Sequence, residues 1–244
     1  MNCRSPATTV DLVRVSEMIC GARALIFDVD GTLAETEEVH RRAFNDAFAQ
    51  MGLDWRWGRR IYRKLLQTAG GKERIRAFDR SRQGPSLLSD QDVIELHRIK
   101  TQRYADLIAN GDCPLRPGVE ALLKSAFRRG QRLAIATTTS LGNIDALLSA
   151  ATGKDWADRF DAIVAGDQVQ RKKPAPEVYL EVLRRLAIPA SDCIAIEDSH
   201  NGLVAASLAG IAVVVTPSVY FDDENFSDAL LVVNDLTALL DKAA

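Results

Sequence analysis

The sequence contains no apolar run that approaches the roughly 20 residues needed to cross a bilayer, although 47% of its 244 residues are hydrophobic. Residues 1–22 also lack the apolar block of about 7–15 residues that is typical of a secretory signal. These absences predict a cytoplasmic protein that associates with no membrane. A chain of this length and apolar content can bury one large core or two modest ones.

Cysteine is scarce, and its spacing matches no common cysteine site. The four cysteines, Cys3, Cys20, Cys113 and Cys193, form no CxxC pair and no Cys/His pattern typical of metal binding. Cys193 begins the apolar run CIAIED, which indicates a buried, reduced thiol. The pattern argues against a disulfide framework.

A strong charge of either sign is also missing. The net charge is −2, and nothing in that balance favours nucleic acid, so we expect no such partner. The charge is unevenly distributed, however, because residues 54–104 contain 13 Lys or Arg and 6 Asp or Glu. A solvated helix face is the simpler interpretation of this basic excess. It gains a functional meaning only if the segment faces an anionic substrate.

Six short segments rich in Val, Ile, Leu and Ala predict buried strands, with helical periodicity between most of them. Residues 118–130, for example, place Val119, Leu122, Leu123, Ala126 and Phe127 on one face. This alternation predicts an α/β fold with a doubly wound, Rossmann-like parallel sheet, whose ligands lie outside the carboxyl ends of the strands. The predicted strands are residues 23–29, 132–137, 162–165, 193–196, 211–215 and 230–233.

One long stretch interrupts the alternation. Between about residues 35 and 111 the sequence shows helical periodicity and no convincing strand, and this stretch is too long for one crossover. We therefore predict an inserted helical domain with hinges near residues 34–38 and 109–117. The predicted organisation is an N-terminal extension (residues 1–22), a core (residues 23–36 and 112–244) and the helical domain (residues 37–111).

Several predicted strands end in residues that carry chemistry. The first, in the stretch ALIFDVDGTL, ends in Asp28 and Asp30. An Asp-Gly turn is the simplest explanation of these acids, but other strand ends and adjoining loops also supply carboxylates, hydroxyls and a cation. Such convergence on one rim indicates a functional site. The other residues are Thr137, Thr138, Thr139, Ser140, Lys172, Lys173, Glu197, Asp198 and Ser199.

In this order, the residues resemble the four motifs of the haloacid dehalogenase superfamily of phosphotransferases. The stretch DVDGT at residues 28–32 is similar to the first motif, Thr137 to the second, and Lys173 before a proline to the third. The pair Glu197–Asp198 is similar to the fourth. The resemblance implies a Rossmann-like core with an inserted helical cap, and hydrolysis of a phosphate ester through an aspartyl-phosphate.

The resemblance also implies the role of each catalytic residue. Asp28 would attack phosphorus, and Asp30 would protonate the leaving alkoxide and then accept a proton from water. Thr137 and nearby amides would hold the phosphoryl oxygens, while Lys173 would neutralise charge. Lys172 is the rival for that last role, but it fits the motif less well and is better explained as a surface charge.

Two carboxylates beside an anionic phosphate require neutralisation, which a hard, oxygen-ligated cation such as Mg²⁺ supplies. By resemblance the ligands would be the Asp28 carboxylate, the Asp30 backbone carbonyl and Asp198. Glu197 would bind the metal either directly or through an intervening group.

The inserted domain and several further stretches resemble one group of enzymes within this superfamily. Helical insertions between the first two motifs act in this superfamily as caps that close over the substrate. The stretches AETEEVHRRAF, TAGGKERI, HRIK, ATTTSLGN and KKPAPEVY are similar to those of the CbbY-type phosphatases. Those enzymes dephosphorylate xylulose-1,5-bisphosphate, an inhibitory by-product of Rubisco, the carbon-fixing enzyme of the Calvin cycle. The resemblance implies substrate contacts at Glu37, His40, Gly70, Gly71, Lys72, Glu73, Arg74, His97, Arg98, Lys100, Thr138, Thr139, Ser140 and Asn143, with Tyr62 a weaker candidate.

A bisphosphate substrate would explain the excess of Lys and Arg in the helical domain. Gly70 and Gly71 permit close backbone approach, and Lys72 and Arg74 can bind a second phosphate away from the reacting one. Glu73 could instead pair locally with Lys72 or Arg76. We expect the aromatic residues Trp55, Trp57, Tyr220 and Phe221 to pack rather than to bind a ligand.

Three alternatives differ in chemistry. A receiver-type phosphoacceptor domain also combines acids, a hydroxyl and a lysine on a parallel sheet, but its acids come from separate strand ends and it lacks a cap. A phosphosugar mutase such as β-phosphoglucomutase shares the four motifs and the cap, and returns the phosphoryl group to sugar instead of water. A phosphatase for glycolate phosphate or another sugar phosphate is the third.

Strand 23–29 begins unusually late for this family. Met18 could equally be the first residue, so we hypothesise that residues 1–17 are dispensable. We expect a monomer, located in the plastid stroma rather than the cytoplasm if the source is a photosynthetic eukaryote.

Overall fold

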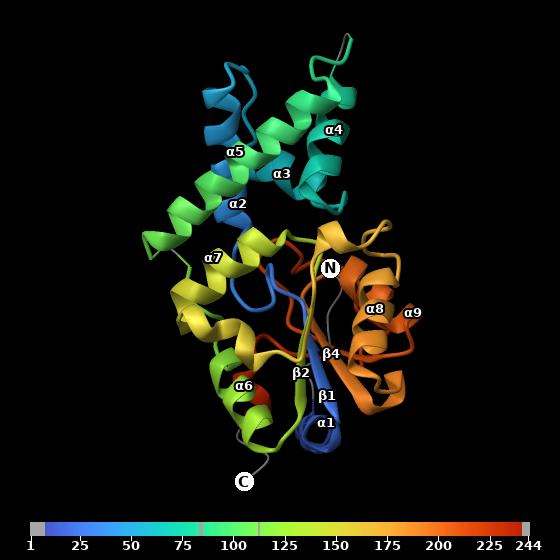
Figure 1. The fold of residues 1–244 in the computed structure, drawn as a ribbon. Helices are drawn as coiled ribbons and strands as arrows, with labels where there is room; N and C mark the ends of the chain where they lie inside the picture. Colours follow the sequence, from blue (N-terminus) through green and yellow to red (C-terminus); the bar gives the residue numbers. More distant parts are fainter. Residues whose placement is uncertain (1–7, 83–84, 112, 241–244) are drawn as a thin grey trace.

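The computed structural model describes residues 8–82, 85–111 and 113–240, which form an α/β core below a smaller helical domain (Figure 1). Six strands form one sheet in the order β3-β2-β1-β4-β5-β6, and every neighbouring pair is parallel. The predicted doubly wound sheet is therefore confirmed. The strands are β1 (Ala24–Phe27), β2 (Arg132–Ala136), β3 (Ala162–Val164), β4 (Cys193–Glu197), β5 (Ala212–Val215) and β6 (Leu231–Val232).

Helices cover both faces of the sheet because its central strands are apolar on both sides, as is usual for buried parallel strands. Ala24 and Ile26 of β1 face α8 (Glu177–Leu186) and α9 (His200–Leu208). Leu25 and Phe27 face the opposite layer. That layer contains α1 (Thr9–Gly21), α6 (Val119–Arg128), α7 (Leu141–Thr152) and α10 (Thr237–Leu240). Short 3₁₀ turns lie at η1 (Lys154–Arg159), η2 (Gly166–Gln168) and η3 (Ala190–Asp192).

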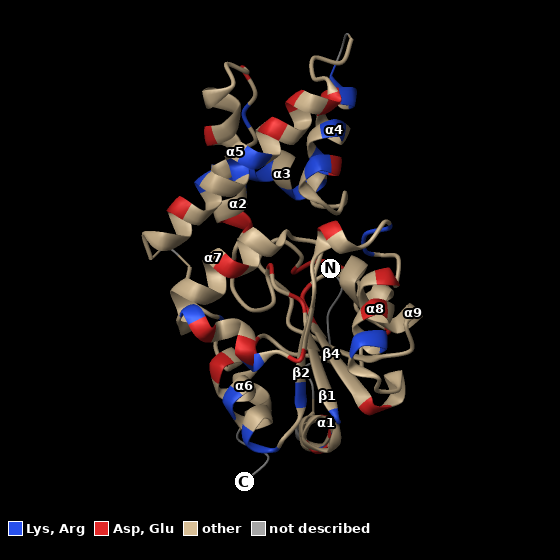
Figure 2. Ribbon diagram, in the orientation of Figure 1, with Lys and Arg blue, Asp and Glu red and all other residues tan. Residues whose placement is uncertain are grey.

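The inserted domain consists of α2 (Glu37–Gln50), α3 (Arg59–Leu65), α4 (Gly71–Ser81) and α5 (Asp90–Ala109). Within residues 37–82 and 85–109 there is no strand, as predicted. Phe44, Phe48, Trp55 and Trp57 pack together in its interior. The two tryptophans are thus packing residues, in agreement with the sequence analysis. Lys and Arg gather on α3, α4 and α5 (Figure 2).

Arg116 holds together the two segments that connect the core to the helical domain. Its backbone N–H donates to the Leu33 carbonyl (2.8 Å), and an isolated bridge pairs Ala34 with Leu115. Its guanidinium donates to the carbonyls of Gly31, Thr216, Pro217 and Asn234. The predicted hinge regions therefore lie side by side and are braced by a residue that the sequence analysis did not single out.

The described part of the N-terminal extension is a packed element and not a free tail. Val15 and Ile19, one turn apart on α1, are buried against the core. The Ser16 hydroxyl donates to the Leu239 carbonyl (3.1 Å), and the Gln131 amide donates to the Ile19 carbonyl (2.7 Å). The described part of the predicted extension (residues 1–22) therefore packs on the core. No helix among the described residues is long and apolar enough to span a membrane.

A chain that begins at Met18 tests this packing. It loses Val15, whose burial contributes roughly 1.5–3 kcal/mol, and each kcal/mol corresponds to about 2–4 °C in a domain of this size. We expect the melting temperature to fall by roughly 5–10 °C in a thermal denaturation experiment. Val10→Ser, at an exposed position of the same helix, should change it little. Equal melting temperatures for the shortened and full chains would restore the hypothesis that residues 1–17 are dispensable.

Candidate active site

One pocket lies between the carboxyl edge of the sheet and the helical domain. Parallel register aligns Phe27 with Ile135 and Ile196, so the segments that follow β1, β2 and β4 emerge together. Every predicted site residue except Arg98, Glu197 and the weaker candidate Tyr62 lines this pocket. These are Asp28, Asp30, Glu37, His40, Gly70, Gly71, Lys72, Glu73, Arg74, His97, Lys100, Thr137, Thr138, Thr139, Ser140, Asn143, Lys173 and Asp198.

The Lys173 ammonium joins two carboxylates at the base of the pocket. Its Nζ lies 2.6 Å from Asp28 Oδ1, 2.6 Å from Glu197 Oε1 and 2.9 Å from the Ala136 carbonyl. The side chain is 5% exposed. Burial opposes its charge, but the two carboxylates outweigh this effect and raise the pKa of Lys173. The ammonium therefore remains charged and cannot turn away without leaving two buried carboxylates unpaired.

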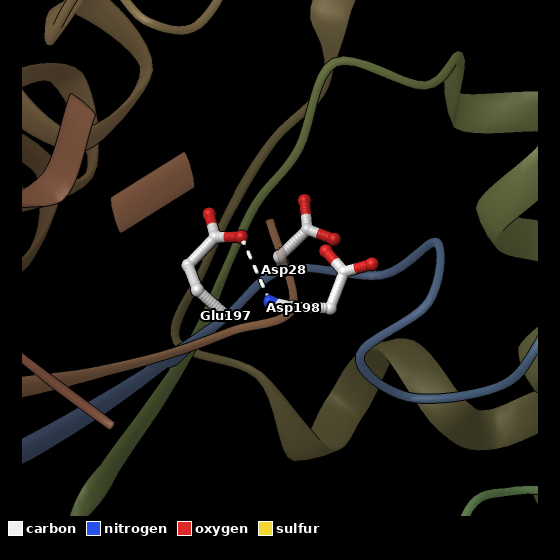
Figure 3. A group of neighbouring side chains, drawn as sticks. All are labelled: Asp28, Glu197 and Asp198. Carbon is white, nitrogen blue, oxygen red and sulfur yellow. Dashed lines mark hydrogen bonds between the residues drawn. The ribbon is translucent and has the colours of Figure 1, made fainter. Parts of the chain in front are cut away.

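Glu197 serves mainly to hold this lysine. It is completely buried, and the Tyr179 hydroxyl donates to the same Oε1 atom that accepts from Lys173. Its other oxygen accepts from the Asp198 backbone N–H (3.3 Å), as Figure 3 shows. A Cβ atom on Gly202 would overlap this carboxylate. Glu197 is thus a buried support behind the pocket wall.

Asp28 and Asp198 present their carboxylates to each other (Figure 3). Oxygen atoms of Asp28, Glu197 and Asp198 lie within 4.8 Å of one another. Burial, with repulsion from Glu197 and Asp30, raises the pKa of Asp28 to about 8 despite Lys173, and burial beside Asp28 and Glu197 also raises the pKa of Asp198. Oδ2 of Asp198 is buried without a hydrogen-bond partner among the described residues. An all-oxygen donor set with an unpartnered buried oxygen fits a hard divalent cation.

The loop after β2 forms the second wall. Thr139 donates its backbone N–H to Thr137 Oγ1 (3.2 Å), and the Asn143 amide donates to Thr139 Oγ1 (2.8 Å). Ser140 Oγ and Asn143 Oδ1 are buried without partners in the described chain. Because α7 begins at Leu141, its first N–H groups lie next to this loop, which favours an anion there.

A hydrogen-bonded chain reaches Asp30 from the helical domain. Asp30 Oδ1 lies 2.8 Å from His40 Nε2 and accepts from the Thr36 hydroxyl (2.6 Å). His40 Nδ1 lies 2.7 Å from Lys100 Nζ. Because an ammonium can only donate, Nδ1 accepts and Nε2–H donates to Asp30. The imidazole also stacks on Tyr104, with 4.2 Å between ring centroids.

The charges of this chain reflect its burial. Burial and the nearby Lys100 charge lower the pKa of His40, which favours the neutral ring. Burial also acts to raise the pKa of Asp30, but His40, Thr36 and Lys100 outweigh it and lower that pKa. Burial lowers the pKa of Lys100 to about 7, with Asp30 opposing this shift.

A second chain orders the remaining cap residues. The Tyr62 hydroxyl donates to Glu37 Oε2 (2.7 Å) and accepts from Arg74 Nη1 (3.1 Å). Tyr62 is completely buried and does not line the pocket. The sequence analysis gave it as a weak substrate contact, whereas the structure gives it the role of positioning Glu37 and Arg74.

The Gly70–Gly71 segment brings the start of α4 close to α5. Gly70 has a φ angle of +92°, which favours glycine. A Cβ atom on Gly71 would lie 2.6 Å from His97 Nε2. Burial, with Lys100 and Lys72 nearby, lowers the pKa of His97 to about 3, so this ring is neutral. The close backbone approach expected from the sequence is therefore present, and it is made to His97.

The predictions for Arg98 and Lys172 were also wrong. Arg98 does not face the pocket: it is exposed and pairs with Glu95, Nη2 to Oε1 2.7 Å. His97 and Lys100, three positions apart on α5, share the inner face, and Arg98 lies about 100° around the helix from His97. Lys172 is not a surface charge, because its side chain is 15% exposed and lines the pocket.

The sequence analysis also missed pocket residues. Asp167 lines the pocket, and so does Phe221, which was expected only to pack. The neighbour of Phe221, Tyr220, donates to Glu38 of α2 (2.8 Å). These residues belong to loops after β3 and β5. Their position after predicted strands was the available signal, although none belongs to a motif.

Comparisons with known proteins identify the family of this chain. A family model described as haloacid dehalogenase-like hydrolase matches residues 22–210. The chain belongs to this family. Its predicted membership is thus confirmed, and with it the assignment to the hydrolases.

Within the family, the similarity to CbbY proteins extends over nearly the whole chain. The chain is 52% identical to Protein CbbY of Rhodobacter capsulatus, over 91% of this chain and 96% of that protein. The crystal structure of CbbY from Rhodobacter sphaeroides in complex with phosphate has a TM-score of 0.85 at 48% identity, covering 88% and 95% of the two chains. A mutant of that protein in complex with xylulose-(1,5)bisphosphate has a TM-score of 0.85 at 47% identity, with the same coverage.

The lowered pKa of Lys100 predicts a pH-dependent affinity. Below about pH 7 the ammonium is charged and attracts a phosphate anion, and this charge is lost as the pH rises through 7 to 8. We expect the KM for a phosphate ester to rise several-fold between about pH 6 and about pH 8. Lys100→Arg should flatten this part of the profile, because a guanidinium stays charged. Steady-state kinetics would contradict the assignment if both proteins showed the same dependence.

Proposed function

We propose that the protein is a Mg²⁺-dependent phosphatase that removes one phosphate from xylulose-1,5-bisphosphate through an aspartyl-phosphate on Asp28. The main support is the buried arrangement of Asp28, Lys173 and Glu197 beside Asp30, beneath a basic cap. The CbbY relatives support the substrate, since one of them has been crystallised with this bisphosphate. In a carbon-fixing cell this reaction would remove an inhibitor of Rubisco.

The first step forms a bond between an Asp28 carboxylate oxygen and phosphorus, and breaks the bond between phosphorus and the ester oxygen. Lys173 orients the nucleophile through Oδ1. Thr137 and the amides that precede α7 would hold the phosphoryl oxygens where negative charge develops. Asp28, Asp198 and the Asp30 carbonyl would hold Mg²⁺, with Glu197 as outer support, and the bound ion would supply neutralisation of the phosphate charge.

Asp30 would donate a proton to the leaving alkoxide and then accept one from the water that hydrolyses the aspartyl-phosphate. Its low pKa in the free protein means that it begins ionised. A phosphate dianion beside it would favour the protonated form, because like charges repel. His40 and Thr36 hold Oδ1, which leaves Oδ2 for the reacting oxygen.

The non-reacting phosphate would bind at the cap side of the pocket. Lys72, Arg74 and Lys100 all line that side, and Arg74 is anchored by Tyr62 and the Leu65 carbonyl. Two phosphates carry more negative charge than one, which explains why the cap is basic while the whole chain is slightly acidic. The expected monomeric state and cytoplasmic or stromal location remain part of this proposal.

A panel of sugar monophosphates and bisphosphates, assayed with Mg²⁺ for phosphate release and for isomer formation, tests the proposal. We expect xylulose-1,5-bisphosphate to give inorganic phosphate with the highest kcat/KM. EDTA should stop this turnover and Mg²⁺ should restore it. Isomerised hexose phosphate without free phosphate would instead indicate the phosphosugar mutase, and a preference for phosphoglycolate would indicate the third alternative.

Asp28→Asn tests the nucleophile. An amide of the same shape is a poor nucleophile, so we expect kcat to fall by more than about a thousandfold while the protein stays folded. Asp158→Asn, an equal charge change at an exposed position, should keep the wild-type rate. An Asp28→Asn protein with even a tenth of the wild-type activity would be incompatible with the covalent mechanism.

A further inference from the structure

Two consecutive lysines, Lys172 and Lys173, point into different parts of the pocket. The Lys173 ammonium is fully engaged by Asp28, Glu197 and a carbonyl, and is 5% exposed. Lys172 Nζ donates to the Gly166 carbonyl. Its closest carboxylate oxygen belongs to Glu73 of the cap, at 4.0 Å. Lys172 therefore has donor capacity that the described protein groups do not use fully.

Lys172 comes from the core, but its side chain lies against the cap. A Cβ atom on Gly70 would lie 3.1 Å from Lys172 Cε. The absence of a side chain at Gly70 thus lets the lysine reach the segment that begins α4. Lys172 and Gly70 line the same pocket as Asp28, so the ammonium lies in this cavity between Gly166 of the core and Glu73 of the cap.

A second ion pair also joins the cap to the core, with the charges of the two domains reversed. Lys72 of the cap is 3.5 Å from Asp167 of the core, Nζ to Oδ1, and both side chains are about half exposed, 42% and 57%. One pair thus runs from a cap lysine to a core carboxylate, and the other from a core lysine to a cap carboxylate. All four side chains line the pocket. The Lys72–Asp167 pair is too exposed, and the Lys172–Glu73 pair at 4.0 Å too long, to contribute much to stability, so their partners are easily replaced.

We propose that Lys172 is a binding residue for the phosphate that is not cleaved, and that Asp167 and Glu73 occupy the two lysines only until a bisphosphate binds. This inference rests on the proposed function and adds a core-domain contact to the phosphate site of the cap. The distal phosphate takes the place of both carboxylates and brings Lys72 and Lys172 to one anion. A substrate with one phosphate leaves the carboxylate pairs in place.

The exchange gives selectivity for bisphosphates. A phosphate dianion offers three oxygens and more charge than one carboxylate, so it is the better partner for two converging ammonium groups. Gly166 links this site to the reacting end, because its carbonyl accepts from Lys172 and its N–H donates to the Thr139 carbonyl (2.8 Å). The distal phosphate and the loop after β2 are therefore held from the same turn, η2.

Lys172→Met tests the contact. It keeps the length of the side chain and removes the charge. We expect kcat/KM for xylulose-1,5-bisphosphate to fall about tenfold or more, as for a charge-assisted hydrogen bond. The value for para-nitrophenyl phosphate should fall by a much smaller factor, so that the ratio between the two substrates collapses. Lys64→Met is the matched control: it removes one cap charge at an exposed position away from the pocket, and should leave that ratio unchanged.

Asp167→Asn distinguishes the proposed exchange of ion-pair partners from an ion pair that only holds the cap closed. If Asp167 competes with phosphate for Lys72, its removal lowers the KM for the bisphosphate by about two- to fivefold, as expected for an exposed pair. If the pair only holds the cap closed, its removal raises the KM for both substrates. The second result would overturn the exchange.

The outcomes also separate this inference from the proposed function. A wild-type protein that prefers the bisphosphate, with a Lys172→Met protein of unchanged preference, would refute the role of Lys172 and leave the proposed function standing. A wild-type protein without any preference for bisphosphates would overturn both. Lys172→Arg keeps the charge and should retain most of the preference for the bisphosphate. A Lys172→Arg protein without this preference would show that the shape of lysine matters and not its charge, and would refute the proposal.

Discussion

The Lys173 ammonium is the interaction on which the site depends. It draws together Asp28 after β1, Glu197 at the end of β4 and the Ala136 carbonyl at the end of β2. The removal of one partner from a buried ion pair typically costs about 3–5 kcal/mol, because a charge is left without compensation. The lysine therefore neutralises the carboxylates at the strand ends, and it reaches all three groups only because the register of the sheet brings these strand ends together. The same charge keeps Asp28 and Glu197 close in spite of their mutual repulsion.

The helical domain completes the chemistry that the core begins. Asp30 belongs to the core, yet the groups that set its charge include His40 of α2 and, through it, Lys100 of α5. Tyr220 of the core in turn donates to Glu38 of the cap. Asp30, the proposed acid–base residue, thus has partners from both domains in this structure. In the proposed mechanism, proton transfer therefore depends on residues of both domains.

The sequence predicted the sheet and the base of the site well, because both depend on local patterns. Buried parallel strands are continuous apolar runs, and the residues that follow them must meet at one edge. Side-chain direction was harder to predict. Arg98 could have been excluded by the helical phase of His97 and Lys100, but no periodicity distinguishes Lys172 from Lys173 in a loop. The i, i+4 spacing of Val15 and Ile19 was an available signal for the packing of α1, and the contacts of Arg116 link positions too distant in sequence to foresee.

In the proposed mechanism Asp28, held by Lys173, attacks phosphorus and carries the phosphoryl group. Rapid acid quenching of a single turnover with xylulose-1,5-bisphosphate, followed by peptide mass spectrometry, tests it most directly. The account predicts that a phosphoryl group appears on the peptide that contains Asp28 and disappears as inorganic phosphate is released. Release of phosphate without this adduct, or an adduct on another residue, would contradict it.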